Sequence, residues 1–168
     1  LKVGTELDED KLLNLVNESH FARAKRRALW YLERGDLSKK QLIEKLSRAF
    51  PKEIAERVAE RFIELSLIDD ERYAARLAER LVFDKKMSPK YAAFLMANKG
   101  IDRATAQSFT ENLEADSLAL IREIIERRYK NRLNDEKEIN RAIGYLSRRG
   151  FEFSDIKKVL REYNDRES

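Results

Sequence analysis

The chain has 168 residues, of which 39% are charged and 42% hydrophobic, with five glycines, two prolines and no cysteine. This mixture is rich in helix formers and poor in turn formers, so it predicts an all-helical protein. The lack of cysteine excludes disulfides and thiolate metal sites, and no apolar run approaches the roughly 20 residues of a membrane span. No signal peptide is visible, and we expect a cytoplasmic protein that does not enter a membrane.

Charge is unevenly distributed along the chain, although the net charge is only +4. Residues 1–18 carry five acidic and two basic side chains, and residues 19–66 carry seven and twelve. Residues 67–116 carry nine and eight, and residues 117–168 carry ten and thirteen. Two basic segments therefore flank a near-neutral one, which indicates an acidic or nucleic-acid partner held at two places.

Caps and helix breakers predict the helices in chain order. A short helix is expected within residues 1–18, followed by long helices at about 20–34, 70–85 and 117–132, each with two further helices behind it. The residues expected to start or end helices are the N-caps and first-turn prolines Ser38, Pro51, Ser88 and Pro89, and the C-terminal glycines Gly35, Gly100 and Gly150.

A repeat of 50 residues appears when Gly100 is placed over Gly150. Three sets of apolar residues then coincide: Leu42, Ala92 and Ala142; Ile43, Ala93 and Ile143; and Leu46, Met96 and Leu146. The repeat predicts three three-helix modules of helix-turn-helix type, at 19–66, 67–116 and 117–168, behind an N-terminal tail at 1–18. One such module buries little surface, so we expect the modules to stack in an elongated, curved array.

Three consecutive acidic residues, Asp69, Asp70 and Glu71, stand where the second long helix is expected to begin. Paired carboxylates can hold a metal or act as acid and base, but the single histidine, His20, is remote in sequence. Capping of the helix N-terminus is the favoured interpretation. No nucleotide-binding glycine loop, zinc motif or nucleophile elbow occurs, so we expect no enzyme and no cofactor.

The first basic cluster lies on the helix expected at 20–34. Steps of 100° per residue place Arg23, Arg26, Arg27, Trp30 and Arg34 on one face, opposite a core face of Phe21, Ala24, Ala28 and Leu32. Two interpretations of Trp30 are open. The favoured one is that the tail helix, through Leu12, Leu13, Leu15 and Val16, covers the ring. The other is an exposed anchor or base-stacking platform.

The second basic cluster lies in the last module. Its candidate binding residues are Arg127, Arg128, Lys130, Arg141, Arg148, Arg149, Lys157 and Lys158. Taken singly, each is explained as a solvated or dipole-compensating side chain, because glutamates such as Glu123 and Glu126 are interleaved. The two clusters together indicate binding to a partner or to nucleic acid.

Several segments in order resemble the RecX family of recombinase regulators. They are AKRRALWYLERGDLSKKQLIEKL, ERFIELSLIDDERYAARLAER, LMANKGID and YLSRRGFEFSDIKKVL, spread over about residues 20–163. The loop before Ser88 departs from the family pattern, because Lys86 and Met87 stand where a glycine is expected. The resemblance implies three tandem three-helix modules that bind the RecA filament, damp strand exchange and ATP hydrolysis, and touch DNA weakly.

We therefore expect a monomeric, non-enzymatic protein that binds RecA filaments on single-stranded DNA and occupies the filament groove. One alternative is a helical repeat protein that binds DNA without a recombinase partner. A weaker alternative is a scaffold that binds only proteins.

Overall fold

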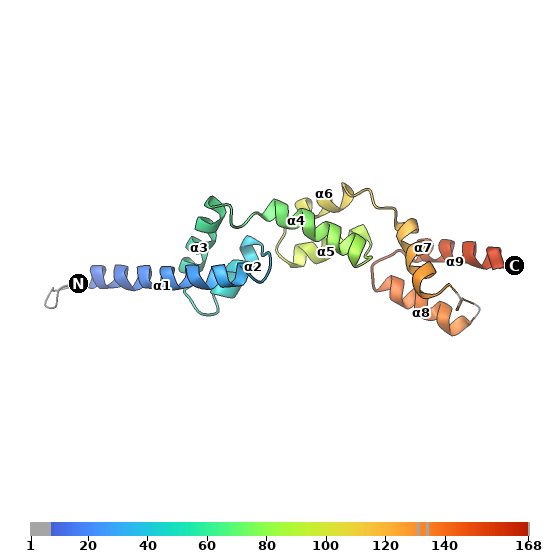
Figure 1. Ribbon diagram of the computed structural model, residues 1–168, viewed down its shortest axis with the longest axis horizontal. Coiled ribbons are helices and arrows are strands. Elements are labelled where there is room, and N and C mark those ends of the chain that lie inside the picture. Colours follow the sequence, from blue (N-terminus) through green and yellow to red (C-terminus); the bar gives the residue numbers. More distant parts are fainter. Residues whose placement is uncertain (1–7, 131, 134, 168) are drawn as a thin grey trace. The chain divides into compact units, whose positions relative to one another are not determined.

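The computed structural model describes residues 8–130, 132, 133 and 135–167, and every regular element in that part of the chain is helical (Figure 1). The all-helical prediction is confirmed. The elements are α1 (Glu9–Leu32), α2 (Lys39–Leu46), α3 (Lys52–Glu64), α4 (Asp70–Glu79), the π-helical η1 (Arg80–Asp84), α5 (Pro89–Asn98), α6 (Arg103–Glu111), α7 (Ser117–Arg128), α8 (Glu136–Ser147) and α9 (Phe153–Glu167). Two compact units, Leu1–Tyr73 and Ala74–Ser168, are described separately below.

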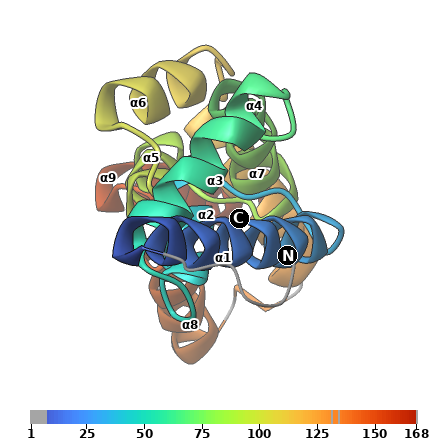
Figure 2. The same cartoon turned by 90° about the vertical axis from the view of Figure 1, so that its left-hand side faces the viewer.

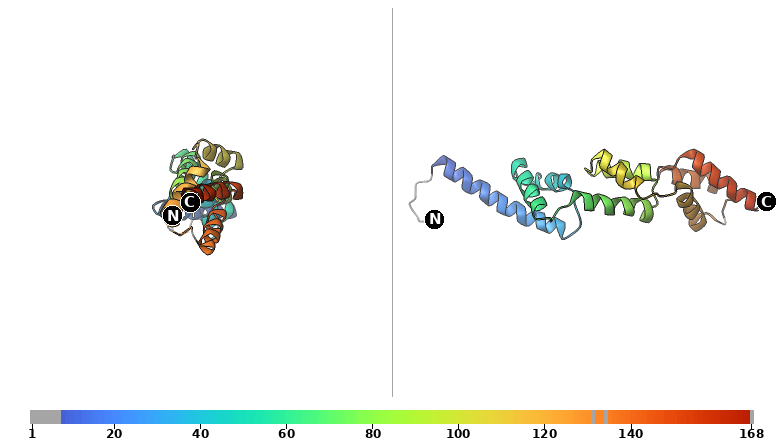
Figure 3. Two further views of the ribbon diagram at one scale, coloured as in Figure 1. Left: turned by 90° about the vertical axis from the view of Figure 1, so that its right-hand side faces the viewer. Right: turned by 90° about the horizontal axis from the view of Figure 1, so that it is seen from above.

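The first helix is longer than predicted. α1 runs unbroken from Glu9 to Leu32, with Asp8 accepting a hydrogen bond from the Lys11 amide as its N-cap. The separate tail helix expected before residue 19 is wrong, because no glycine or proline interrupts this stretch. The first turns of α1 extend beyond α2 and α3 (Figures 1 and 3), and their apolar side chains stay exposed: Leu12, Leu13, Leu15 and Val16.

The core of the first unit forms where α2 and α3 pack on the second half of α1. α3 crosses α1 steeply, as Figures 1 and 2 show. The predicted core face of α1 is confirmed, since Ala24 and Ala28 are fully buried while Phe21 and Leu32 pack at the margin. Small alanines let the crossing helices approach closely, and larger residues from α2 and α3 fill the space around them.

The acidic triplet holds two helix ends in the first unit. Asp69 accepts a hydrogen bond from the Arg72 amide at 2.9 Å, so it caps α4 as predicted. Asp70 instead contacts another helix: its carboxylate accepts a hydrogen bond from the Lys39 amide at 2.8 Å. That amide belongs to the first turn of α2, which also carries the predicted Ser38 cap as a capping box with Gln41. One side chain thus ties α2 to the start of α4.

In the second unit, α5 and α6 lie side by side (Figure 3) and η1 packs on α5, while α9 packs on both α7 and α8. The predicted long helix at 117–132 is shorter, because α7 ends at Arg128. Lys130 and Arg132 therefore follow the helix instead of lying on it. The residues aligned by the repeat occupy equivalent places: Leu42, Ala92, Ala142, Leu46, Met96 and Leu146 are all 0% exposed.

A tight interlock joins α5 to the turn between α8 and α9. Ser88, the N-cap of α5, accepts from the Tyr91 amide at 3.2 Å and donates through its hydroxyl to the Gly150 carbonyl at 2.7 Å. Its own amide donates to the Arg149 carbonyl at 2.9 Å. Gly150 has a φ of +80°, and a Cβ there would overlap Tyr91 Cβ and lie 2.8 Å from Ser88 Oγ. Only glycine fits this turn without displacing α5.

Replacing Gly150 by alanine should lower the free energy of unfolding by about 2–4 kcal/mol, because overpacking adds to the cost of a left-handed backbone. Gly144→Ala is the matched control, since a Cβ at that helical position meets only the end of the Arg148 side chain, at 3.4 Å. It should be neutral or stabilising by up to about 1 kcal/mol. Chemical denaturation of both variants measures this, and equal stabilities would contradict the interlock.

Replacing Asp69 and Asp70 together by alanine should cost about 1–2 kcal/mol, because two helix N-termini lose carboxylate acceptors. Glu71→Ala is the control, since Glu71 is exposed and makes no hydrogen bond or ion pair within the described residues; it should stay within about 0.5 kcal/mol of the parent. Denaturation measures the stabilities. Faster amide exchange at Lys39 in Asp70→Ala alone would separate the cross-fold contact from the local cap.

Candidate functional site

The end of α1 carries a cluster of cations around aromatic rings. The Arg34 guanidinium lies 3.6 Å from the centre of the Trp30 ring and also donates to the Trp30 carbonyl at 3.0 Å. Arg27 lies 4.9 Å from the same ring and 5.4 Å from the ring of Tyr31. Lys45 of α2 approaches Tyr31 from another element, at 5.1 Å. We call Arg27, Trp30, Tyr31, Arg34 and Lys45 the tryptophan cluster.

Trp30 is 40% exposed, so the favoured expectation that a tail helix covers it is wrong. The apolar residues expected to cover the ring lie about four to five turns away on the same continuous helix. They cannot fold back on Trp30 while α1 is intact. Arg23 and Arg26 are exposed on α1 but lie over no ring in the described chain. The sequence placed all four arginines on one face, and the structure shows that only Arg27 and Arg34 lie over the Trp30 ring.

A second cluster surrounds Tyr145 on α8. Arg149 lies 4.0 Å from the ring centre and Arg128, from the end of α7, lies 4.6 Å from it. Tyr129 packs against the same ring edge-on, with centroids 6.3 Å apart. The structure thus brings Arg128 and Arg149, predicted from separate helices, onto one side chain. We call Arg128, Tyr129, Tyr145 and Arg149 the tyrosine cluster.

The remaining predicted residues of the second unit are not gathered there. Lys130 pairs with Glu126 and Arg141 pairs with Glu138, as local ion pairs between residues four and three positions apart. Lys157 lies 4.8 Å from the exposed ring of Phe153. Arg148 and Lys158 are exposed without a carboxylate partner among the described residues.

Sequence reasoning missed two cations beside the tyrosine cluster, Lys85 and Lys86, which follow η1. Lys86 has a φ of +53° and pairs with Glu123 at 2.7 Å; Arg127 pairs with the same carboxylate at 3.3 Å. The hydrogen bond from Lys86, aided by the charges of Lys86 and Arg127, lowers the pKa of Glu123, so the carboxylate stays ionised at neutral pH. The only hint in the sequence was the absent glycine before Ser88.

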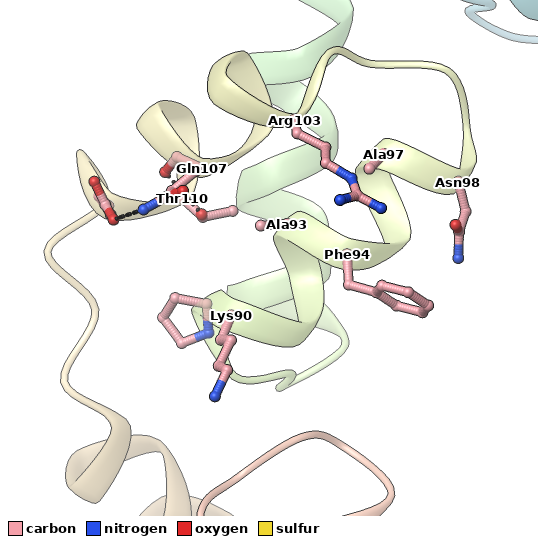
Figure 4. A pocket seen from close by; sticks show the side chains of 10 residues that line it. Lys90, Ala93, Phe94, Ala97, Asn98, Arg103, Gln107 and Thr110 are labelled. Carbon is pink, nitrogen blue, oxygen red and sulfur yellow. Dashed lines mark hydrogen bonds between the residues drawn. The ribbon is translucent and has the colours of Figure 1, made fainter.

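A groove between α5 and α6 was also missed, because its segment is nearly neutral. Ala93 and Ala97 form its floor, Phe94 stands at its edge and is 55% exposed, and Arg103 leans over it from α6 (Figure 4). Gln107 and Glu111 are hydrogen bonded to each other at 2.7 Å along the other wall.

Within the described residues, no three histidine, aspartate or glutamate side chains gather as a metal site would require. No helix in the described chain is long and apolar enough to cross a membrane. The two basic clusters are the candidate binding surfaces.

Comparison with known proteins identifies the family. The family model of the first three-helix domain of RecX matches residues 24–62, and that of the third three-helix domain matches residues 114–160. The regulatory protein RecX of Clostridioides difficile is 31% identical, over 95% of this chain and 77% of its own length. That of Clostridium acetobutylicum is 30% identical, over 96% and 78%. The chain belongs to the RecX family of regulatory proteins.

Solved RecX structures share the fold. The crystal structure of RecX from Lactobacillus salivarius superimposes with a TM-score of 0.70 over 88% of this chain and 98% of its own, at 21% identity. A second crystal structure, of a regulatory protein RecX, gives 0.74 over 95% and 82%, at 22% identity. The helical architecture is thus that of RecX proteins.

Trp30 is the single tryptophan and reports on its own cluster. In this RecX protein, iodide should quench Trp30 more efficiently than caesium does, because Arg27 and Arg34 attract anions to the ring. Arg34→Gln should lower the iodide quenching constant roughly twofold at moderate ionic strength. Acrylamide, which is uncharged, should quench Trp30 in Arg34→Gln at least as well as in the parent, because the guanidinium no longer covers the ring. The control is Arg26→Gln, which removes the same charge from α1 at a residue that lies over no ring, and an equal drop there would contradict a local effect.

Proposed function

We propose that this RecX protein is a non-enzymatic, cytoplasmic regulator that binds RecA-type recombinase filaments on single-stranded DNA. Bound along the filament groove as a monomer, it restrains strand exchange and ATP hydrolysis. The observation that carries the proposal is one guanidinium–aromatic cluster in each compact unit. Arg27 and Arg34 in the first unit, and Arg128 and Arg149 in the second, have no carboxylate partner within the described chain. Such cations remain available to an acidic surface.

Two clusters on one chain suit a polymeric partner. When one cluster is bound, the other is held near the next binding surface, and this effective concentration multiplies the affinity. The proposed modules at 19–66, 67–116 and 117–168 would place the clusters in the first and third, with the near-neutral second between them. A protein held at two places can obstruct the path of incoming duplex DNA without any catalytic group.

The second candidate function is binding to DNA without a recombinase. The same clusters favour it, because guanidinium groups pair with phosphate as readily as with carboxylate. The two functions differ in salt dependence. Binding to bare DNA weakens steeply as salt rises, in proportion to the number of phosphates neutralised. Binding to a protein surface that also buries apolar area weakens less.

The test measures ATP hydrolysis by a RecA-type filament on single-stranded DNA as this protein is titrated. One variant carries Arg27→Gln, Arg34→Gln and Lys45→Gln in the tryptophan cluster; another carries Arg128→Gln and Arg149→Gln in the tyrosine cluster, together with Arg148→Gln beside it in sequence. Each should raise the concentration for half-inhibition by tenfold or more, on the order of the gain expected from linked sites. Circular dichroism checks that both variants keep their helical content.

The control variant carries Lys40→Gln, Arg48→Gln and Arg103→Gln, three exposed cations without a partner among the described residues. It removes the same charge away from both clusters and should inhibit nearly as well as the parent. If all three variants lose inhibition equally, net charge rather than the clusters is responsible. Binding to bare single-stranded DNA that is as tight as binding to filaments would favour the second candidate.

A further inference from the structure

The tyrosine cluster opens into a hollow of about 470 Å³ within the second unit. Two lysines after η1, two arginines at the end of α7 and one arginine after α8 supply its charge: Lys85, Lys86, Arg127, Arg128 and Arg149. Asp84 and Glu123 are the two carboxylates that line it, and the guanidinium groups of Arg128 and Arg149, which come from different elements, both lie over the Tyr145 ring. We call this hollow the basic pocket.

The five cations of the basic pocket face only two carboxylates. Glu123 is shared between Lys86 and Arg127, at 2.7 and 3.3 Å. Arg128 and Arg149 are left facing the Tyr145 ring without an ion pair in the described part of the chain. The Nε atom of Arg149 is buried and has no hydrogen-bond acceptor among the described residues. A buried donor without an acceptor costs free energy. The oxygen of a bound ligand can supply the acceptor that the Nε atom lacks.

The backbone around the basic pocket is strained. Lys86 adopts a left-handed conformation, with φ at +53°, which a residue with a side chain adopts less readily than glycine does. The next residues lead into the interlock, where the Ser88 amide donates to the Arg149 carbonyl at 2.9 Å. The segment that carries Lys85 and Lys86 is therefore held against Arg149, although the two are distant in sequence. A pocket whose walls are fixed before binding loses little freedom when it binds.

We infer that the basic pocket binds a phosphate group through the guanidinium forks of Arg128 and Arg149. Two forks and Lys85 carry more positive charge than one carboxylate neutralises, and they match a phosphate with several oxygen atoms. Because the two guanidinium groups already lie over the Tyr145 ring, a base would have to displace one of them to stack there. The pocket thus recognises phosphate irrespective of base sequence.

The phosphate can belong to the backbone of single-stranded nucleic acid or to a free polyphosphate. The first source rests on the proposed function, in which the partner filament carries such a strand; the pocket itself does not. Both sources present the same oxygen atoms to Arg128 and Arg149, and separate probes distinguish them.

The test uses the full chain and fluorescein-labelled oligothymidylate, with anisotropy read at several salt concentrations. Arg128→Gln with Arg149→Gln should weaken binding by tenfold or more. It should also flatten the plot of log affinity against log salt by about 0.7 for each phosphate that is no longer neutralised. Arg103→Gln with Lys137→Gln removes the same charge from exposed positions of the same unit and should change neither value as much. Equal slopes and affinities in the two double variants would overturn the inference.

A second variant separates binding from folding. Arg128→Lys with Arg149→Lys keeps the charge but removes the forks, so it should retain most of the salt slope and lose affinity. Melting temperatures measured with sodium pyrophosphate identify the source. If pyrophosphate stabilises the parent but not the glutamine variant, and competes with the oligonucleotide, the pocket accepts free polyphosphate. If only the oligonucleotide and its abasic analogue bind, the phosphodiester backbone is the ligand.

Filament inhibition is measured on the same variants. A glutamine variant that loses oligonucleotide binding but inhibits filaments normally supports the pocket and removes it from the proposed function. A variant that retains oligonucleotide binding but loses inhibition overturns the pocket and leaves the proposed function standing.

Discussion

The contact on which the second unit most depends is the interlock of Ser88 with Gly150. One serine caps α5, donates its hydroxyl to the Gly150 carbonyl and donates its amide to the Arg149 carbonyl. Because a Cβ at Gly150 would overlap Tyr91, the two backbones touch without side chains between them. This contact sets the distance between the lysines after η1 and the arginine after α8. The basic pocket therefore exists because a helix cap also joins two segments that are distant in sequence.

In the first unit, a side chain rather than a backbone carbonyl holds the start of a short helix. The start of α2 is held by the Asp70 carboxylate, which accepts the Lys39 amide, whereas the start of α5 is held by backbone carbonyls. Both helices begin at a buried serine, Ser38 or Ser88. The first amide groups of a helix have no acceptor within the helix. In each case a later segment of the chain supplies one of these acceptors. Helices of eight to ten residues are marginal alone, so these contacts fix their position as well as their ends.

The sequence predicted what depends on local chemistry and periodicity. Helix starts at Ser38, Pro51 and Ser88, and the buried positions shared by the repeat, follow from capping and from 3.6-residue spacing. Two features did not follow. The charge change near residue 18 suggested a boundary, but a change of charge does not break a helix, and with no glycine or proline there α1 continues. The basic pocket unites Lys86, Arg128 and Arg149 through tertiary contacts, which no periodicity within one helix encodes.

The two clusters show how arginine and aromatic side chains divide their roles. At Trp30 and at Tyr145 the ring faces are covered by the chain's own guanidinium groups, at 3.6 and 4.0 Å. Each ring orders an arginine that would otherwise be mobile, and the arginine's outward N–H groups remain free to donate. Such a surface attracts oxygen-rich anions and disfavours base stacking, because a base would have to displace a cation. In the function proposed above, this arrangement makes binding independent of DNA sequence, because phosphates and acidic side chains do not change with the sequence that a filament covers.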